Sequence, residues 1–550
     1  MGIKNISGFL GNALLLALPV QLYAQYEKTE KPNVLFISID DLKPEMGVYG
    51  NDMIRTPNMD RLALMGTLFL ENHCQQAVCA PSRVSLLTGK RPDYTKVWDL
   101  NTLMRDMHPD ILTLPQHFKE NGYRTLGTGK IFDFRSVTRE QDQISWSDPY
   151  LRVTENYFHD RQRPILYYYQ NPENRVTAKK YLAKAEEQGL TGNDAIQNAL
   201  QYFKPSVESA DVPDNAYHDG AMTLLALETL SELAQSDEPF FLAVGYHLPH
   251  LPFVAPDKYW ELYDREQMPL APFQKPAKNS PAIAYHNSGE LRSYTDIPPL
   301  ASFSDQPYGI GLPEYKQKEL IHGYYAATSF VDAQIGKLLD FLEDSGLIEN
   351  TIIVLWGDHG WHLGDHDLWC KHTNFEQSTR SPLIISAPWL PPGVTTGVTE
   401  FVDVFPTLSE LAGLSIPENL DGLSLVPLMK DPDDFVKDIA VSQFPRGNNI
   451  MGYSIRTGRY RLTYWMGEGY RTTMPFSEEM LVAKELYDYR RDPLETVNVA
   501  GRLFYRKAYR NMRHKMLEFF ESQLEQNREY GSVRQGDQQS PVTPPIQTGN

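Results

Sequence analysis

Reactive side chains follow four short apolar runs of this 550-residue sequence, and each run has the length and composition of a β-strand. These side chains are Asp40, Asp41, Lys130, His247, Asp358 and His359. The carboxylates are hard oxygen ligands, which suit Ca²⁺ or Mg²⁺ better than a soft metal. Singly, acidic and histidine residues are common in loops after strands. Their recurrence after four strands predicts one shared cleft, because parallel sheets bind ligands beyond the carboxyl ends of their strands.

Zinc is the alternative metal, because His359, His362 and His366 fall within a short span. Gly360 and Gly364 interrupt that span and make a helix there unfavourable. Without a helix, His362 and His366 need not share a face, so the pattern favours the oxygen-rich site.

The segment 79–89 carries the most distinctive pattern of the chain, Cys-Ala-Pro-Ser-Arg-Val-Ser-Leu-Leu-Thr-Gly. Pro81 suits the first turn of a helix, and Gly89 suits its end. Cys79 then lies at a helix N-terminus, where free N–H groups and the helix dipole favour an anion. Arg83, one turn further on, can hold that anion by a charge-assisted bond. The competing interpretation is a buried structural cysteine beside a surface arginine.

Apolar runs of strand length alternate with helical patterns, which predicts βαβ units and an α/β fold with a mostly parallel sheet. Strands are expected at 34–39, 240–244, 352–356 and 383–386, and helices at 221–233 and 324–342. The segment 268–313 is rich in Pro and Ser and lacks periodicity. We therefore expect a long loop there, at the border of the site.

The sequence changes character near residue 431, which predicts a smaller C-terminal α+β domain. Residues 454–465 alternate like one antiparallel strand, and residues 516–524 have the pattern of a closing helix. The final residues are polar and contain proline, which is typical of a disordered tail. The expected organisation is a signal peptide at 1–24, a catalytic domain at 30–430, the C-terminal domain at 431–528 and the tail at 529–550.

The composition is that of a globular protein, with 41% hydrophobic and 22% charged residues. A formal net charge of −18 argues against a general nucleic-acid binder. Lys4 and the apolar run 9–20 form a secretory signal peptide, too short to span a bilayer, and no later run is long enough. The remaining chain has no Asn-x-Ser/Thr acceptor for glycan-dependent sorting. We expect a bacterial protein exported to the periplasm or secreted, without an integral membrane segment.

At Cys79-x-Pro81-Ser82-Arg83 the sequence resembles the type I sulfatases. The residues 75–85, 241–247, 358–361 and 451–456 are most similar to the iduronate-2-sulfatase branch of that family. The matching stretches run from about residue 33 to 495, nearly the whole mature chain. The resemblance implies an alkaline-phosphatase-like sandwich with a central, mostly parallel sheet and a smaller C-terminal domain with an antiparallel sheet.

The resemblance also implies the chemistry. In this family a maturation enzyme oxidises the cysteine to Cα-formylglycine, whose hydrate is the nucleophile that attacks a sulfate ester. A bound Ca²⁺ and clustered cations offset the negative charge of that ester. Carried over to this sequence, the metal ligands are Asp40, Asp41, Asp358, His359 and the modified Cys79.

Further roles follow from the same resemblance. Arg83 and Lys130 are expected to neutralise the sulfate and steady the formylglycine. Lys371 and His247 are expected to contact the sulfate ester, and one of them to protonate the leaving sugar oxygen. Asp133 stands where the family usually has a histidine shortly after the lysine. We expect Asp133 either to act as the base in place of that histidine or to point elsewhere while another group serves.

Three residues are candidates for substrate binding. Trp361 and His372 can stack on a sugar ring or hydrogen-bond to it, and Arg446 can reach a uronate carboxylate. For each of them, packing in the core or a place on the solvated surface is the plain alternative.

The expected substrate is a sulfated oligosaccharide, with the 2-O-sulfate of a terminal iduronate or unsaturated uronate favoured. The alternatives are an algal polysaccharide such as ulvan, and a phosphate or phosphonate monoester hydrolysed on the same fold. A glycan-binding protein without activity is the outcome if Cys79 stays unmodified. The chain is acidic overall while Arg83, Lys130 and Lys371 are cationic, which favours short fragments and an exo mode.

Overall fold

The computed structural model describes residues 28–298, 311–447 and 449–534, with side chains up to residue 528. The predicted signal peptide at 1–24 and the part of the predicted tail from 535 onward lie outside the described residues. Within the described ranges, none of the helices combines the length and the apolar character needed to cross a bilayer.

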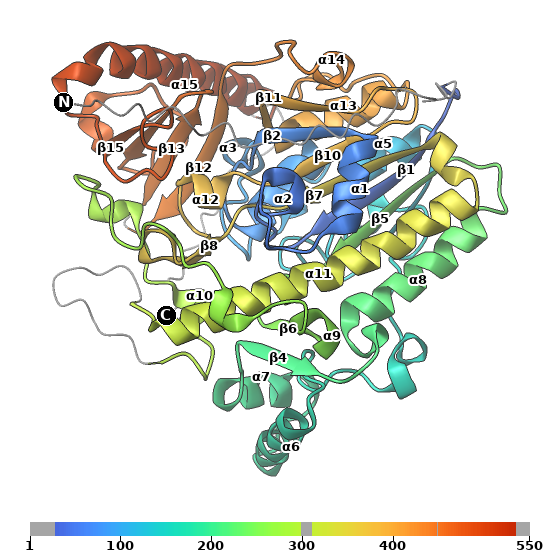
Figure 1. Cartoon of the computed structure of the whole chain (residues 1–550). Helices are drawn as coiled ribbons and strands as arrows, with labels where there is room; N and C mark the ends of the chain where they lie inside the picture. The colour runs from blue at the N-terminus through green and yellow to red at the C-terminus, as the bar shows by residue number, and fades with distance from the viewer. Residues whose placement is uncertain (1–27, 299–310, 448, 535–550) are drawn as a thin grey trace, which may run out of the picture.

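A seven-stranded sheet lies at the centre of the larger part of the described chain, in the order β11-β2-β10-β7-β1-β5-β3 (Figure 1). Its strands are β1 (Asn33–Ile39), β2 (Thr67–His73), β3 (Arg124–Gly129), β5 (Phe240–Tyr246), β7 (Thr351–Gly357), β10 (Leu383–Ser386) and β11 (Gly393–Glu400). β10 runs antiparallel to both of its neighbours, and the other neighbouring pairs are parallel. The predicted α/β fold with a mostly parallel sheet is confirmed, and the four predicted strands are found within one or two residues of their expected ends.

Helices cover both faces of this sheet, which explains why β1, β5 and β7 are buried along their whole length and mostly apolar rather than alternating. On one face lie α1 (Pro57–Met65), α8 (His218–Leu233) and α11 (Glu314–Asp344), packed on a core that includes Leu35 and Ile37. On the other face lie α2 (Cys79–Thr88), α5 (Leu114–Glu120) and α13 (Val404–Leu411), packed on a core that includes Val34 and Phe36. The predicted helices at 221–233 and 324–342 are the central parts of α8 and α11.

A second, antiparallel sheet holds the strands β12 (Ala440–Arg446), β13 (Ile450–Arg456), β14 (Tyr460–Met466) and β15 (Leu481–Asp488), in that order. The single strand predicted at 454–465 is wrong: this stretch belongs to the hairpin of β13 and β14. The chain turns at Thr457, whose backbone N–H donates to the carbonyl of Tyr460 at 2.8 Å. Alternation of side chains continues across a tight turn, so the pattern alone concealed it.

The long helix α15 (Arg506–Arg534) packs on this second sheet through residues such as Met516 and Phe520. The predicted helix at 516–524 is only its middle part, because its first and last turns lack a strong apolar face. The helix also runs past residue 529, where we predicted that the tail begins.

The remaining helices and strands of the described chain lie between these elements in sequence. They are α3 (Pro92–Thr95), α4 (Met104–Met107), α6 (Pro172–Glu187), α7 (Gly192–Tyr202), β4 (Val207–Ala210), β6 (Phe253–Pro256), α9 (Asp257–Trp260), α10 (Gly289–Arg292), β8 (His362–Leu363), β9 (Trp369–Cys370), α12 (Glu376–Thr379) and α14 (Val426–Lys430). The predicted loop at 268–313 is irregular apart from α10 and one short 3-10 turn, Ala282–Ala284, in its described part. It carries one residue, Glu290, that reaches the site below.

Candidate active site

The carboxyl ends of β1, β3, β5 and β7 meet at one edge of the central sheet (Figure 1). The backbone N–H groups of Asp40 and Lys130 donate to carbonyls at the end of β5, at 3.1 and 2.8 Å. The backbone N–H of Asp41 donates to Oδ1 of Asp358 at 2.9 Å. Asp40, Asp41, Lys130 and Asp358, which follow these strands, therefore converge as the sequence predicts.

A buried acidic cluster forms where they meet. One ligand atom from each of Asp41, Cys79, Asp358 and His359 lies within 4.8 Å of the others. Nε2 of His359 is 3.6 Å from Sγ of Cys79 and 3.3 Å from Oδ1 of Asp41. Asp40 lies beside them and is also buried. The five side chains expected to hold a metal are thus together and shielded from solvent.

The donor set fits a hard divalent cation. Burial raises the pKa of Asp41 well above its ordinary value, and the nearby carboxylates of Asp40 and Asp358 add to the effect against the opposing charge of Lys371. Carboxylates crowded in this way repel one another, and a bound cation removes that repulsion. Oxygen-rich sites of this kind suit Ca²⁺ or Mg²⁺.

Helix α2 places Cys79 at its first position and ends at Gly89, which adopts a left-handed conformation with φ of 63°. Both features are as predicted. Burial raises the pKa of the Cys79 thiol well above its ordinary value, and the nearby Asp40 carboxylate raises it further. The unmodified side chain is therefore a neutral thiol, which is a poor nucleophile.

Arg83 lies behind the cluster and is fully buried. Its Nε donates to Asp358 at 3.0 Å and its Nη2 to Asp40 at 3.1 Å. Nη1 donates to Oγ of Ser38 at 3.1 Å and to two main-chain carbonyls after β3. With its donors engaged in this way, Arg83 holds the carboxylates in place and lies too deep to touch a substrate directly.

Lys130 and Lys371 approach the cluster from opposite sides. Nζ of Lys130 lies 2.5 Å from Asp40, and Nζ of Lys371 lies 2.9 Å from Asp41. Although burial opposes ionisation, Lys130 and Arg83 hold the pKa of Asp40 well below its ordinary value. Both lysines are placed to attract an anion that approaches the metal-ligating residues.

Glu290 completes the surroundings of Lys371. Its Oε1 lies 2.9 Å from Nζ of Lys371 and 3.2 Å from Nε2 of His250. Sequence reasoning missed Glu290, although it lies in the segment expected to border the site. The sequence signal that could have identified it is an acidic residue within a segment expected to border the site.

His250, rather than His247, faces the cluster. Nε2 of His250 lies 3.7 Å from Oδ2 of Asp41, and Nδ1 lies 2.6 Å from the carbonyl of Leu251. A proton on Nδ1 satisfies that carbonyl and directs Nε2 toward the site. The side chain of His247 is 47% exposed, and its Nδ1 lies 3.4 Å from the buried Asp219. Sequence reasoning chose the first histidine after β5, but the loop turns inward three residues later.

Asp133 is held by two cations. Its carboxylate accepts from Nε and Nη2 of Arg135 at 2.8 and 2.7 Å, and Oδ2 lies 3.6 Å from Nζ of Lys130. Although burial opposes ionisation, Arg135 and Lys130 keep the pKa of Asp133 far below its ordinary value. Such a carboxylate is a weak base, which favours the second of the two expectations, that another group serves as the base.

The three expected substrate-binding residues differ in their surroundings. Trp361 is 1% exposed and lies beneath Lys371, whose Nζ is 4.8 Å from the ring centroid. The side chain of His372 is 26% exposed, with Nε2 at 3.9 Å from Glu290. His372 is thus partly accessible to solvent at the border of the cluster.

Arg446, at the end of β12, joins the second sheet to loops that border the site. Its guanidinium donates to the carbonyls of Ile283 and His372 at 2.9 and 2.7 Å, and lies 5.5 Å from the ring centroid of Trp465. Burial lowers the pKa of Arg446 to about 9. Its donors serve main-chain carbonyls, so in this structure Arg446 holds the loops around the site.

The zinc alternative fails on geometry. Nε2 of His362 lies 3.0 Å from Oγ1 of Thr373, and His366 stacks on Phe375 with centroids 4.4 Å apart. Neither joins His359 in a group of ligand atoms among the described residues.

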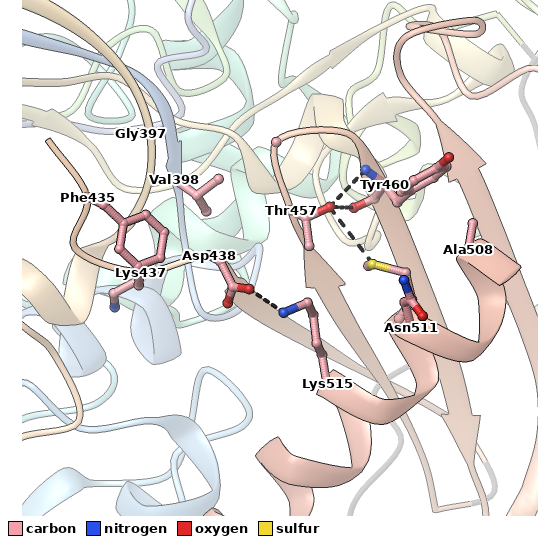
Figure 2. Close-up of a pocket in the computed structure, with 12 residues that line it drawn as sticks. Gly397, Val398, Phe435, Lys437, Asp438, Thr457, Tyr460, Ala508, Asn511 and Lys515 are labelled. Carbon is pink, nitrogen blue, oxygen red and sulfur yellow. Dashed lines mark hydrogen bonds and ion pairs between the residues drawn. The ribbon is translucent and has the colours of Figure 1, made fainter. Parts of the chain in front are cut away.

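A cavity of about 400 Å³ lies elsewhere, between β11, the β13–β14 hairpin and α15 (Figure 2). None of the site residues lines it. Its charged residues include the ion pair of Asp438 and Lys515, which the figure marks with a dashed line. With these charges already paired, the cavity holds no cluster of reactive groups among its described lining residues.

Comparison with known proteins agrees with this arrangement. A family model described as Sulfatase matches residues 32–414, and one described as N-sulphoglucosamine sulphohydrolase, C-terminal, matches residues 364–522. The chain belongs to the sulfatase family. It is a sulfuric ester hydrolase, with the fold and the C-terminal antiparallel sheet that the sequence predicts.

Two relatives of this sulfatase are named iduronate 2-sulfatase. The protein from Mus musculus is 36% identical, over 86% of this chain and 91% of its own length. The protein from Homo sapiens is 34% identical, over 90% and 95%. A solved structure, of BT4656 in complex with its substrate D-glucosamine-2-N,6-O-disulfate, superposes with a TM-score of 0.66 at 21% identity, covering 90% of this chain and 99% of that one. It supports the fold.

Proposed function

We propose that this sulfatase removes the 2-O-sulfate of a uronic acid, iduronate or its unsaturated equivalent, from short heparin- or dermatan-type fragments. The observation that carries the proposal is the buried acidic cluster around Cys79, bordered by Lys130 and Lys371. Identity of 34–36% to two proteins named iduronate 2-sulfatase supports this substrate class.

Ca²⁺ is the metal that we assign to the cluster. Asp40, Asp41, Asp358 and His359 would hold it, together with the side chain at position 79. When bound, it supplies positive charge that polarises the sulfate group. We further propose that a maturation enzyme converts Cys79 to formylglycine, whose hydrate serves as the nucleophile. The neutral state of the Cys79 thiol supports this conversion, because an unmodified side chain would attack poorly.

The other side chains around the cluster have separate roles in the proposed reaction. Arg83 fixes the carboxylates of Asp40 and Asp358, so the metal-ligating atoms need not reorganise. Lys130 and Lys371 bind the sulfate oxygens and offset their charge. His250, in place of the expected His247, directs Nε2 toward the leaving oxygen, and the ammonium group of Lys371 delivers the proton to that oxygen.

The proposed setting is outside the cytoplasm. The basic and apolar pattern of residues 1–24 supports export to the periplasm or secretion by a bacterium. The proposed partners are the sulfated oligosaccharide and the enzyme that modifies Cys79.

The test uses the full chain produced in a host that contains a formylglycine-generating enzyme. Mass spectrometry of the peptide that spans Cys79 is expected to show an aldehyde in place of the thiol. A panel of defined disaccharides, sulfated at one position each, is expected to show release of sulfate from the 2-O-sulfated uronates. Cys79→Ala serves as the inactive control.

Each proposal can fail separately. A thiol at position 79 in an active preparation would overturn the formylglycine assignment. Turnover restricted to 6-O-sulfated hexosamines or to ulvan fragments would overturn the uronate assignment and leave the sulfatase chemistry intact.

A further inference from the structure

Asp133 and Arg135 form a charged pair beside the sulfate-binding lysine. Two parallel bonds join them, from Nε and Nη2 of Arg135 to the two carboxylate oxygens of Asp133. The backbone N–H of Arg135 donates to Oδ1 as well, at 3.0 Å. The guanidinium is therefore held in one orientation, with little rotational freedom left to lose on binding.

Arg135 differs from the other cations around the cluster in its exposure. Its side chain is 35% exposed, whereas those of Lys130 and Lys371 are 8% and 3% exposed. Arg83 is fully buried. Among these described cations, Arg135 is the one that a ligand can reach without displacing a neighbouring side chain.

The guanidinium also keeps unused donors. Of its five N–H groups, the two that face Asp133 are engaged, and Nη1 makes no hydrogen bond with the described residues. An arginine fork can bind an oxyanion through such free N–H groups while its other edge stays paired.

The free donors of Arg135 lie close to the lysine at which we place the sulfate. Oδ2 of Asp133 lies 2.7 Å from Nη2 of Arg135 and 3.6 Å from Nζ of Lys130. One carboxylate oxygen thus separates Arg135 from a lysine that binds the sulfate. An anion on the same sugar, or on the next one, can lie within reach of Arg135 while the ester lies at Lys130.

An aromatic ring lies beside the same guanidinium. Phe134 is 64% exposed, and its ring centroid is 5.3 Å from the Arg135 guanidinium carbon. An exposed ring next to a fixed cation suits an anionic sugar, which offers an apolar face and a charged group together.

We propose that Arg135, oriented by Asp133 and flanked by Phe134, binds a second oxyanion of the substrate, next to the sulfate ester that is cleaved. The inference rests on the proposed function and deepens it. Asp133 is then a positioning residue, and its negative charge serves Arg135 and Lys130 rather than abstracting a proton. The second oxyanion is the carboxylate of the uronate or a sulfate on the neighbouring sugar.

The test compares substrates with and without a second anion. Wild type and Arg135→Gln are assayed on an aryl sulfate, a 2-O-sulfated uronate disaccharide, its carboxyl-reduced analogue, and a version with an additional N-sulfate. We expect Arg135→Gln to lower kcat/KM about tenfold or more on substrates with the second anion, mainly through KM. The aryl sulfate should be hydrolysed at close to the wild-type rate.

Controls separate binding from folding. Arg139→Ala removes the same charge four residues away, from an exposed side chain, and should leave the selectivity unchanged. Arg135→Lys keeps the charge but loses the fork, so an intermediate selectivity is expected; it carries the test if Arg135→Gln fails to fold. Thermal unfolding of each variant shows whether the pair matters only to stability.

The outcomes are distinct. If the fall in kcat/KM of Arg135→Gln depends on the carboxylate, Arg135 binds the uronate. If the fall depends on the N-sulfate, Arg135 binds the neighbouring sugar. If Arg135→Gln loses kcat/KM equally on every substrate, or loses none, the inference is overturned. The proposed function still stands in that case, provided that the wild type hydrolyses uronate sulfates. A wild type inactive on every uronate sulfate overturns both.

Discussion

At the scale of single residues, Glu290 brings Lys371 and His250 to one carboxylate. Lys371 is held between Glu290, Asp41 and the ring of Trp361, which fixes the position of its ammonium group. His250 has Nδ1 committed to a main-chain carbonyl and Nε2 directed to Glu290 and the cluster. Lys371 and His250 are thus neighbours at the cluster, and their lower exposure distinguishes both from His247.

A pair of variants tests this assignment. His250→Ala is expected to lower kcat about a hundredfold, because it removes the group that we place at the leaving oxygen. His247→Ala, three residues earlier in the same loop, should change kcat less than about threefold, because its ring contacts Asp219 and solvent. Steady-state kinetics on a sulfate ester decides between them, and the reverse ranking would restore His247 to the site.

At the scale of elements, β3 and β5 approach each other closely where Lys130 leaves the sheet. A Cβ at Gly245 would lie 2.6 Å from the backbone nitrogen of Lys130 and closer still to its carbonyl. The carbonyl group of Lys130 also accepts from Oγ of Ser38 at 2.8 Å. The absence of a side chain at Gly245 therefore sets the position of the lysine.

Gly245→Ala should push the backbone of Lys130 away from β5. We expect a loss of about 1–3 kcal/mol in the free energy of unfolding, as is usual when atoms are forced into a packed core. Activity should fall further than stability explains, because Lys130 moves with its backbone. Gly458→Ala is the matched control, since nothing lies within 4 Å of a Cβ there. Urea unfolding and kcat/KM of both variants provide the comparison; equal behaviour would contradict this role.

The start of α12 meets the second sheet at Glu495. This buried carboxylate accepts from the backbone N–H of Glu376 at 2.9 Å and from the hydroxyl of Tyr489 at 2.6 Å. Burial raises the pKa of Glu495 from 4.5 to about 7, and the nearby Glu376 carboxylate adds to the effect against Arg461. The folded state therefore favours the protonated form of Glu495.

A pH dependence of stability follows from that shift. The contribution of Glu495 to the free energy of unfolding is fully present below pH 4.5, the ordinary pKa of a glutamate. This contribution is lost as the pH rises through about 7, the pKa in the folded state. Glu495→Gln mimics the protonated form, so the variant should lose less stability than wild type between about pH 5 and pH 8. Thermal midpoints across this range test the idea, and parallel curves for the two proteins would refute it.

At the scale of the whole molecule, the two halves of the chain share the site. The first half supplies Asp40, Asp41, Cys79 and Lys130, and the second supplies Asp358, His359 and Lys371. Arg446, from the second sheet, fastens the loops between them. A cation bound in the cluster therefore joins distant parts of the fold.

Metal removal should weaken the whole fold. Chelation is expected to lower the thermal midpoint by several degrees and to abolish activity, because buried carboxylates are then left to repel one another. Added Ca²⁺ should restore both, and Asp358→Asn should make the midpoint insensitive to chelator. An unchanged midpoint in wild type would argue that no cation occupies the cluster.

The sequence predicted the sheet, the convergence of its strand ends and the Cys79 helix, because local patterns determine these. It could not place His250, Glu290 or Arg135. Their positions depend on how loops turn after a strand, and loop geometry leaves no periodic pattern in a sequence. The roles expected of Asp133 and Arg446 did not take account of their partners, Arg135 and main-chain carbonyls, which only the folded chain shows.

The burial of Cys79 limits when its side chain can be modified. The side chain is 1% exposed at the start of α2, beneath the strand ends that form the cluster. An enzyme that acts on it needs the surrounding backbone in its own active site, and the folded molecule does not offer that access. The modification that we propose must therefore precede folding, while the chain is being made or exported. Molecules that fold too early would keep a thiol permanently, so a sample can be fully folded and only partly active.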